Sequence, residues 1–232
     1  MELPASSPPS SRPAGATDRI VEALREAIVT LELKPGALLD KQQLTSRYGV
    51  SRFPVAEALN RLKLEGLVDI RPQSGSSVSL IRLADVRENM FLRRALEAET
   101  VAALAAAPGE HLLDELRRNL RYQKAASEAD DRLGFHTLDL AFHDIMISAS
   151  GYRRVRATVE SARLALDRVR RLIGSPRRQA ITYAEHQAIV DAIAAGNPDA
   201  ARAAMAAHLD AVMVEIEAFA EDDPTVFVGR ES

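Results

Sequence analysis

The 232-residue chain contains no cysteine and no tryptophan, and aromatic residues make up only 4% of it. Without cysteine the chain forms neither a disulfide framework nor a thiolate metal site, so nitrogen and oxygen atoms must hold any bound metal. The absence of disulfide chemistry also fits a reducing compartment, and we expect the protein to be cytoplasmic.

Long apolar runs are missing as well. The run at residues 101–107 is far shorter than the roughly 20 residues that a transmembrane helix needs. The N-terminus has no basic segment followed by an apolar one, which a secretion signal would require. The sequence therefore predicts a globular protein with no membrane partner, and a hydrophobic content of 47% is ample for its cores.

An overall excess of positive charge is also lacking, since the formal net charge is −3. The distribution of charge is more informative than its sum. Residues 41–71 carry six basic and three acidic side chains, a local charge of +3, whereas residues 81–232 carry 20 basic and 24 acidic ones. This division predicts a small basic module followed by a larger, mildly acidic one.

The basic module has the pattern of three helices and a hairpin. The first 16 residues are rich in serine, proline and alanine, which predicts a disordered tail. Thr17 is the expected cap of a first helix that ends before the Pro-Gly turn at 35–36. Ser51 is the expected cap of the third helix. We expect the second and third helices at 41–48 and 52–66, and the two strands of the hairpin at 67–71 and 77–81.

The rest of the chain is rich in alanine, leucine, arginine and glutamate and has no β pattern, which predicts packed helices. Proline and glycine divide it into six expected helices at 84–107, 110–127, 131–149, 152–173, 176–195 and 198–221. Residues 222–232 are expected to form a loose tail. The predicted fold class is mostly α, with a winged helix-turn-helix domain at 17–81 followed by an all-α helical bundle at 84–221.

Two helices joined by a tight turn and followed by a hairpin have the order of a winged helix-turn-helix. In that geometry the second helix enters the major groove of double-stranded DNA, and the hairpin reaches the neighbouring backbone or minor groove. A generic helical bundle would leave the hairpin unexplained. We therefore predict that residues 17–81 bind DNA.

The string GVSRFPVAEALNRLKLEGLV, followed by RPQSGSSVS, resembles the DNA-binding domain of the GntR family of regulators. The resemblance implies that Ser51 and Arg52 begin the recognition helix, with Arg52 reaching guanine or phosphate, and that Gly75 lets the wing tip approach DNA closely. Gln42 and Ala56 stand where the family commonly has arginine. These two departures leave room for an operator unlike the family's usual one.

Other basic side chains of the module are candidates for phosphate contacts. Arg47 is the first of them. For Arg61 and Lys63 a merely solvated, charged helix face is an equally good interpretation.

Histidine is scarce, with five in the chain, but its placement is informative. Asp139 and His143 are four residues apart, so they project from one face of a helix, as two ligands of one cation must. His186 and His208 fall within apolar stripes and should point into the bundle. One interior histidine is usually a core residue, but three converging with an aspartate would leave buried polar groups unsatisfied without a metal. We expect His136 to pack at the core boundary or support the site, and His111 to be exposed.

The acidic module resembles the FadR-type ligand-binding domain of the same family, called FCD. The strings that carry the resemblance are LRRALEAE at 92–99, LDLAFHDIMISASG at 138–151, EHQAIVDAIAAGNPDAA at 185–201 and AMAAHL at 204–209. It implies a divalent metal, with zinc preferred and nickel or manganese as alternatives, held by Asp139, His143, His186 and His208. Six helices favour the VanR-like branch of the domain.

Four ligands leave coordination positions open for water or an incoming carboxylate. Arg93 stands at the arginine of the family's RxxLE pattern, and we expect it to bind the carboxylate of a small organic acid. Arg94, Arg163 and Arg170 are alternatives, each with a surface position as the simpler expectation.

These features together predict a transcription regulator, with repression as the expected direction. A homodimer would bind a palindromic operator and respond to the acid at the metal. Two alternatives stay open, a regulator whose metal is purely structural and a metal-dependent hydrolase in a helical bundle. The hydrolase would need a general base that the sequence does not single out, and it would have no use for residues 17–81.

Overall fold

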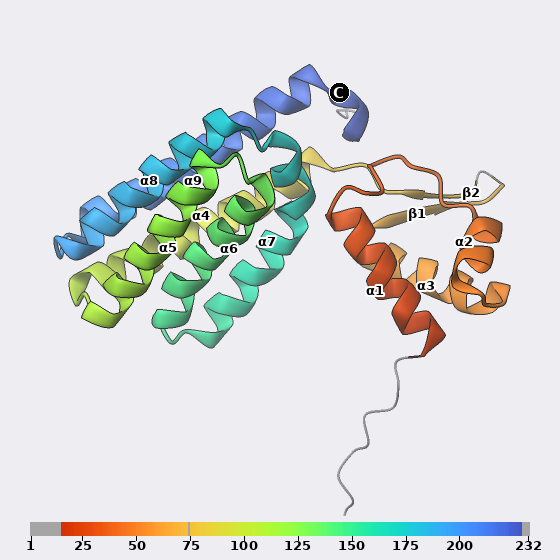
Figure 1. Ribbon diagram of the computed structural model, residues 1–232, viewed down its shortest axis with the longest axis horizontal. Helices are drawn as coiled ribbons and strands as arrows, with labels where there is room; N and C mark the ends of the chain where they lie inside the picture. Colours follow the sequence, from red (N-terminus) through yellow and green to blue (C-terminus); the bar gives the residue numbers. More distant parts are fainter. Residues whose placement is uncertain (1–14, 74, 229–232) are drawn as a thin grey trace, which may run out of the picture. The chain divides into compact units, whose positions relative to one another are not determined.

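The computed structural model describes residues 15–73 and 75–228 and divides the chain into two compact units, Met1–Ser79 and Leu80–Ser232 (Figure 1). The expected N-terminal tail therefore lies outside the described residues up to position 14. Of the last two tail residues, Gly15 is the N-cap of the first helix and Ala16 is its first residue.

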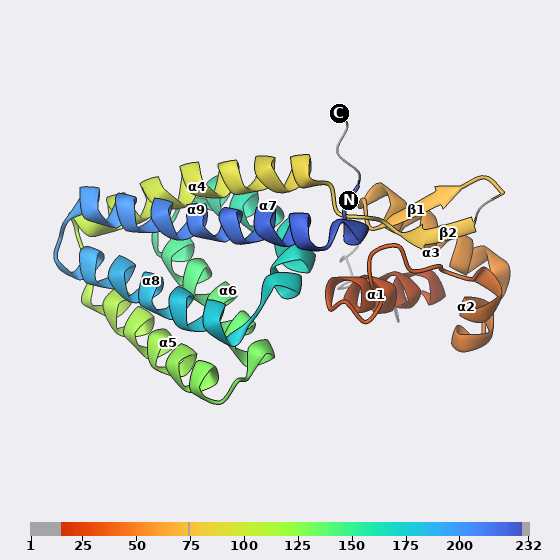
Figure 2. The same cartoon turned by 90° about the horizontal axis from the view of Figure 1, so that it is seen from above.

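The first unit is a winged helix-turn-helix, as the sequence predicts (Figures 1 and 2). Its elements are α1 (Ala16–Val29), α2 (Lys41–Tyr48), α3 (Arg52–Leu64), β1 (Val68–Arg71) and β2 (Gly75–Val78). Apolar side chains from all five elements form one core, which includes Ile20, Leu24, Ile28, Leu44, Val55, Leu59, Leu62, Val68 and Val78. This core fixes α3 against α1 and β1, so the outer face of α3 is presented on a rigid base.

Local signals explain the helix ends in this unit. Helix α1 begins at Ala16, one residue before the expected cap Thr17. Helix α2 is capped by Asp40 and ends at Gly49, whose positive φ of 62° closes the turn between the two helices. Ser51 precedes α3 as expected, but its hydroxyl makes no capping hydrogen bond.

The second strand of the hairpin begins and ends earlier than the sequence suggests. The second strand covers Gly75–Val78 rather than 77–81, with Arg71 opposite Gly75 and Val68 opposite Val78. The alternating pattern continues past Val78 and so does not mark the end of the strand. Ile81, expected in the hairpin, belongs to the second unit.

The second unit consists of six helices over the described residues, which agrees with the number expected (Figures 1 and 2). They are α4 (Leu83–Ala106), α5 (Glu110–Glu128), α6 (Arg132–Ala149), α7 (Arg153–Ile173), α8 (Pro176–Ala194) and α9 (Pro198–Asp222). Helix α9 packs along α4 and beside α8, and α5 packs against α6 and α8. Their shared core includes Leu116, Phe142, Met146, Leu166, Ile189, Ile193, Met205 and Ile216.

The expectation of a loose tail at 222–232 is wrong for 222–228, because Asp222 ends α9 and the residues after it are packed, while 229–232 lie outside the described residues. A short 3₁₀ turn, Pro224–Val226, brings Phe227 into a buried position. The Ile81 amide donates to Val226 (2.9 Å), and the Val228 amide donates to the Ile81 carbonyl (2.8 Å). The sequence around Ile81 does not indicate this pairing, because the partner residues lie almost 150 positions away in the chain.

None of the described helices is long and apolar enough to cross a bilayer.

Candidate metal centre and DNA-binding surface

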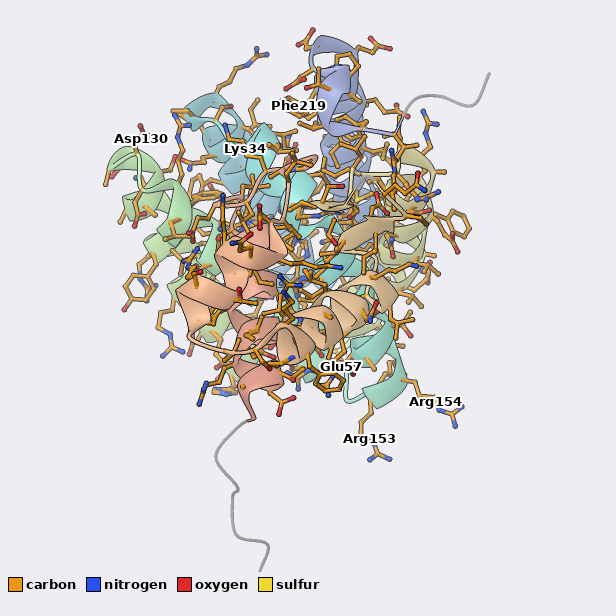
Figure 3. The ribbon with its side chains drawn as sticks, turned by 90° about the vertical axis from the view of Figure 1, so that its right-hand side faces the viewer. Lys34, Glu57, Asp130, Arg153, Arg154 and Phe219 are labelled. Carbon is orange, nitrogen blue, oxygen red and sulfur yellow. The ribbon has the colours of Figure 1, made fainter. Side chains whose placement is uncertain are left out.

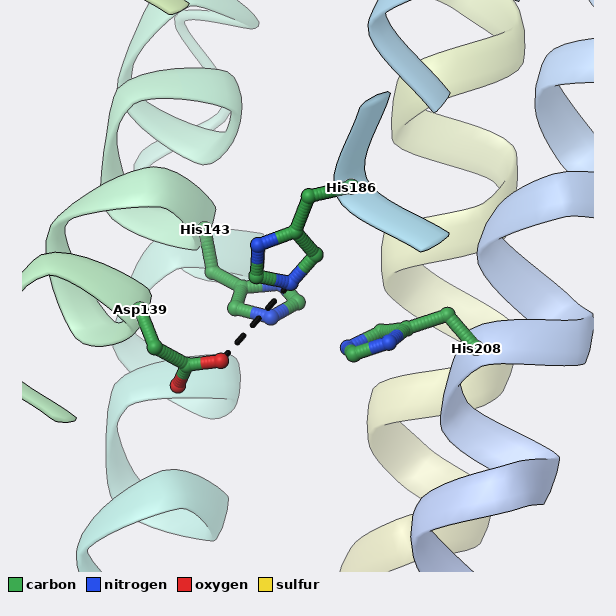
Figure 4. A group of neighbouring side chains, drawn as sticks. All are labelled: Asp139, His143, His186 and His208. Carbon is green, nitrogen blue, oxygen red and sulfur yellow. Dashed lines mark ion pairs between the residues drawn. The ribbon is translucent and has the colours of Figure 1, made fainter. Parts of the chain in front are cut away.

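The structure brings together the four predicted metal ligands. Asp139 and His143 lie on α6, His186 on α8 and His208 on α9, and all four are buried (Figure 4). One donor atom from each lies within 4.8 Å of the others. Donors about 2.1 Å from a common ion can be up to about 4.2 Å apart, so shifts of a few tenths of an ångström would close this set around a divalent cation.

Helical periodicity explains why these polar side chains face the interior. His143 follows Phe142 on α6 and shares the buried face with Met146. The Phe142 ring stacks on the imidazole of His186, with ring centroids 4.0 Å apart. The aromatic and aliphatic neighbours hold the imidazoles in place and exclude water from them.

Each imidazole has a polar partner beside its Nδ1 atom. His143 Nδ1 lies 2.6 Å from a carboxylate oxygen of Glu97, and His208 Nδ1 lies 2.7 Å from one of Glu185. His186 Nδ1 lies 2.9 Å from the amide oxygen of Gln123. The acceptors beside His186 and His208 favour the tautomer with a proton on Nδ1, which leaves the Nε2 lone pair of each free for a metal. The Glu97 oxygen is close to His143 Nδ1, but the two atoms do not have hydrogen-bond geometry.

The inward atoms are left without hydrogen-bond partners. Within the described part of the chain, no hydrogen-bond partner is found for Asp139 Oδ1 or for the Nε2 atoms of His143, His186 and His208. Asp139 Oδ1 and His186 Nε2 face each other at 3.7 Å, which is too long for a hydrogen bond (Figure 4). Unsatisfied buried polar atoms are rare, since each costs roughly 1–3 kcal/mol. Four such atoms facing one point fit the donor set of a metal site.

The protonation states suit the same purpose. Burial holds the pKa values of His143 and His186 well below the ordinary histidine value and lowers the pKa of His208 to about 3. Burial would raise the pKa of Asp139, but the permanently charged Arg170 guanidinium holds it well below its usual range. One anionic and three neutral donors are therefore present at neutral pH.

The three alternative effector arginines differ in their positions. Arg170, expected at the surface, has a side chain only 10% exposed, and its Nη2 donates to Asp139 Oδ2 (2.6 Å). Arg163, also expected at the surface, is half-buried and donates to the carbonyl of Leu140. Arg94 is exposed, as expected, and pairs with Asp210.

Arg93, the predicted effector residue, is fully buried on α4. Its Nε donates to Glu97 (2.6 Å), while its Nη1 has no hydrogen-bond partner among the described residues. Arg170 Nη1 likewise has no hydrogen-bond partner among the described residues. Two buried guanidinium N–H groups thus remain available to an anion.

The other two histidines lie outside the ligand set. His136 Nε2 lies 2.6 Å from Asp167, so it pairs with that carboxylate rather than supporting Asp139. His111 is exposed, as expected.

Sequence reasoning missed the partners that orient the imidazoles, namely Glu97, Gln123 and Glu185. The sequence could have indicated Glu97, because it lies four residues after Arg93 in the RxxLE pattern and therefore on the same helix face. Gln123 lies on α5, 63 residues from His186, and no local pattern relates the two.

The predicted DNA-binding residues lie at exposed positions of the first unit. Ser51 and Arg52 start α3, and Gln42 and Arg47 lie on α2. Gly75 is exposed opposite Arg71, at the turn end of the hairpin, with a φ of 89°. A positive φ at this position favours glycine.

The remaining basic candidates divide into two kinds. Arg61 donates to Asp18 (2.8 Å) and reaches Glu57 (3.5 Å), so it ties α3 to α1 and is less available to phosphate. Lys63 is exposed.

Comparison with known proteins identifies both units. Residues 16–78 match the family described as bacterial regulatory proteins, gntR family, and residues 88–211 match the FCD domain. An HTH-type transcriptional regulator from an unstable DNA locus of Streptomyces ambofaciens is 40% identical, over 92% of this chain and 91% of that protein. The HTH-type transcriptional repressor RspR of Escherichia coli is 30% identical, over 90% of this chain and 92% of its own.

Among solved structures, a GntR transcriptional regulator from Rhodococcus sp. RHA1 has a TM-score of 0.71 with this chain at 26% identity. The match covers 87% of this chain and 97% of that one. The predicted resemblance and fold class are confirmed, while the VanR-like branch stays a prediction.

Proposed function

Because this chain belongs to the GntR family of DNA-binding transcription regulators and carries an FCD domain, we propose that it acts as an operator-binding homodimer controlled by a small carboxylate at a divalent metal. It is a regulator and not an enzyme. The repressor among its relatives supports repression as the direction of control.

The proposed DNA contacts begin at the N-terminal end of α3. Arg52 reads guanine or phosphate, Ser51 binds beside it, and Gln42, Arg47 and Gly75 approach the backbone from α2 and the wing. A palindromic operator presents two equivalent half-sites, so a two-fold symmetric dimer is the assembly that matches it.

The observation that supports metal-dependent sensing is the set of four inward atoms without hydrogen-bond partners among the described residues, Asp139 Oδ1 and three Nε2 atoms. Nitrogen and oxygen donors of this kind suit zinc, with nickel or manganese as alternatives. When bound, the ion supplies positive charge and open coordination positions for a carboxylate.

Recognition of the acid falls to the buried guanidiniums. Arg93 and Arg170 each keep an Nη1 group without a partner in the described residues, and N–H groups of this kind form strong charge-assisted bonds with carboxylates. Their Glu97 and Asp139 contacts hold both side chains in position before the ligand arrives.

Binding at this site involves three helices at once, since the ligands come from α6, α8 and α9. We infer that the acid favours one packing of these helices and so changes the spacing of the two recognition helices in the dimer. Linkage then requires that operator DNA change the affinity for the acid by the same factor.

The test combines metal analysis, a thermal-shift screen of small carboxylates at fixed metal, and gel shifts on DNA upstream of the gene. We expect one bound divalent ion per chain, and a raised melting temperature with an acid that also changes operator affinity. His186→Ala should lose the metal, whereas the matched His111→Ala, at an exposed position, should keep it.

Arg52→Ala should abolish specific DNA binding while the metal content stays unchanged. Unaltered operator affinity in this variant would contradict the placement of the recognition helix. A protein that binds metal yet responds to no carboxylate would favour the alternative of a purely structural ion.

A further inference from the structure

An aromatic side chain stands exposed beside Arg52 at the start of α3. Phe53 is 78% exposed and Phe91 on α4 is 70% exposed, whereas Phe135, Phe142 and Phe227 are buried. A single exposed apolar residue is common on protein surfaces, so the position of Phe53, rather than its exposure, carries the argument.

Helical geometry places Phe53 on the side of α3 that faces away from the core. The buried residues of α3 are Val55, Ala58, Leu59 and Leu62. Because the helix turns about 100° per residue, the Phe53 position lies almost opposite the middle of this stripe. Glu57, one turn further along the exposed side, is labelled in Figure 3.

The neighbours of Phe53 leave it free to meet DNA. Ala56, three residues on, is small and adds to an apolar strip on this part of the helix. Within the described residues Ser51 has no capping bond and Arg52 has no ion pair. The start of α3 therefore presents a hydroxyl, a guanidinium and an apolar ring side by side.

These three groups match different features of base edges in the major groove. A guanidinium suits guanine and a hydroxyl suits either donors or acceptors, but an apolar ring has one apolar counterpart there, the C5-methyl group of thymine. We propose that Phe53 is a specificity-determining residue that contacts a thymine methyl in each operator half-site, next to the base pair read by Arg52.

This inference rests on the DNA binding of the proposed function. The experiment starts by selecting duplexes from a random library with the full-length, metal-loaded protein. Each thymine of the selected duplex is then replaced in turn by deoxyuridine, which removes the methyl group and keeps every hydrogen-bonding group. Affinity is measured for the wild type, for Phe53→Ala and for Leu64→Ala, whose side chain is 89% exposed near the other end of α3.

We expect one thymine in each half-site to be sensitive to this replacement. Deoxyuridine at that position in one half-site should weaken wild-type binding about fourfold, the effect of removing one methyl group from apolar contact. Replacement in both half-sites should weaken it roughly 15-fold. Phe53→Ala should bind the thymine and deoxyuridine duplexes equally, and Leu64→Ala should behave as the wild type.

Several outcomes would overturn the inference and are distinguishable. A wild type that is insensitive to every deoxyuridine, or a Phe53→Ala variant as sensitive as the wild type, would remove Phe53 from base recognition while operator binding stands. Failure to enrich any duplex would instead contradict the proposed operator binding itself.

Discussion

Glu97 links Arg93, the proposed effector residue, to His143 of the candidate metal site, and replacing Glu97 tests that arrangement. The carboxylate is buried on α4, accepts a 2.6 Å hydrogen bond from Arg93 Nε and lies 2.6 Å from His143 Nδ1. Glu97→Gln keeps the size and removes the charge. The variant therefore leaves Arg93 buried without its carboxylate partner.

The expected loss of stability is large. Removing one partner of a buried ion pair costs about 3–5 kcal/mol, because the remaining charge is uncompensated. For a domain of this size, about 2–4 °C of melting temperature corresponds to each kcal/mol, so we expect a fall of about 6–20 °C. Urea denaturation and calorimetry of the chelator-treated protein at pH 7.5 measure both quantities without a contribution from bound metal.

Glu99→Gln is the matched control, because the same substitution two residues later on α4 removes an exposed pair with Arg202. Exposed pairs contribute little, and we expect no measurable change. The double variant Arg93→Leu/Glu97→Leu removes both buried charges and should be more stable than Glu97→Gln. Equal stabilities for Glu97→Gln and Glu99→Gln would refute the reasoning.

Two further predictions concern the same site. The metal-free protein should lose stability as the pH falls from 7 to 5, because the folded-state pKa values of His143, His186 and His208 lie below the unfolded value near 6.5, so only the unfolded chain takes up protons there. The slope approaches about 4 kcal/mol per pH unit for three protons, and denaturation curves that coincide across this range would contradict it. Gln123→Leu should weaken metal binding about 10- to 100-fold in competition with a chelator, because His186 loses the acceptor that orients it. Gln43→Leu, at an exposed position of α2, should bind metal as the wild type does.

Much of the fold could be predicted because residues that start or end helices are placed clearly in the sequence. Pro108-Gly109 and Asn197-Pro198 mark helix boundaries, and the predicted ends of the six later helices fall within one residue of the observed ones. The inward direction of the histidines also followed from periodicity, since a residue inside an apolar stripe shares its face.

The features that sequence reasoning missed depend on contacts between distant segments. The burial of Arg163 and Arg170 is set by how α7 packs against its neighbours, and helical spacing alone does not report it. On the edge of the second strand that faces away from the first, Val78 exchanges hydrogen bonds with Gly36 and Ala37, far earlier in the sequence. Pairing between such distant segments leaves no local pattern to detect.

The pairing of Val226 and Val228 with Ile81 affects how the protein can be handled. Truncation after Asp222 would strip the Ile81 backbone of both bonding partners and uncover the ring of Phe219, which now packs against Phe227. Affinity tags should therefore be fused before α1 and not directly after Val228. The same anchorage fastens the end of the helix that bears His208 to the residue two positions ahead of α4, so the first and last helices of the bundle are stapled together at one end.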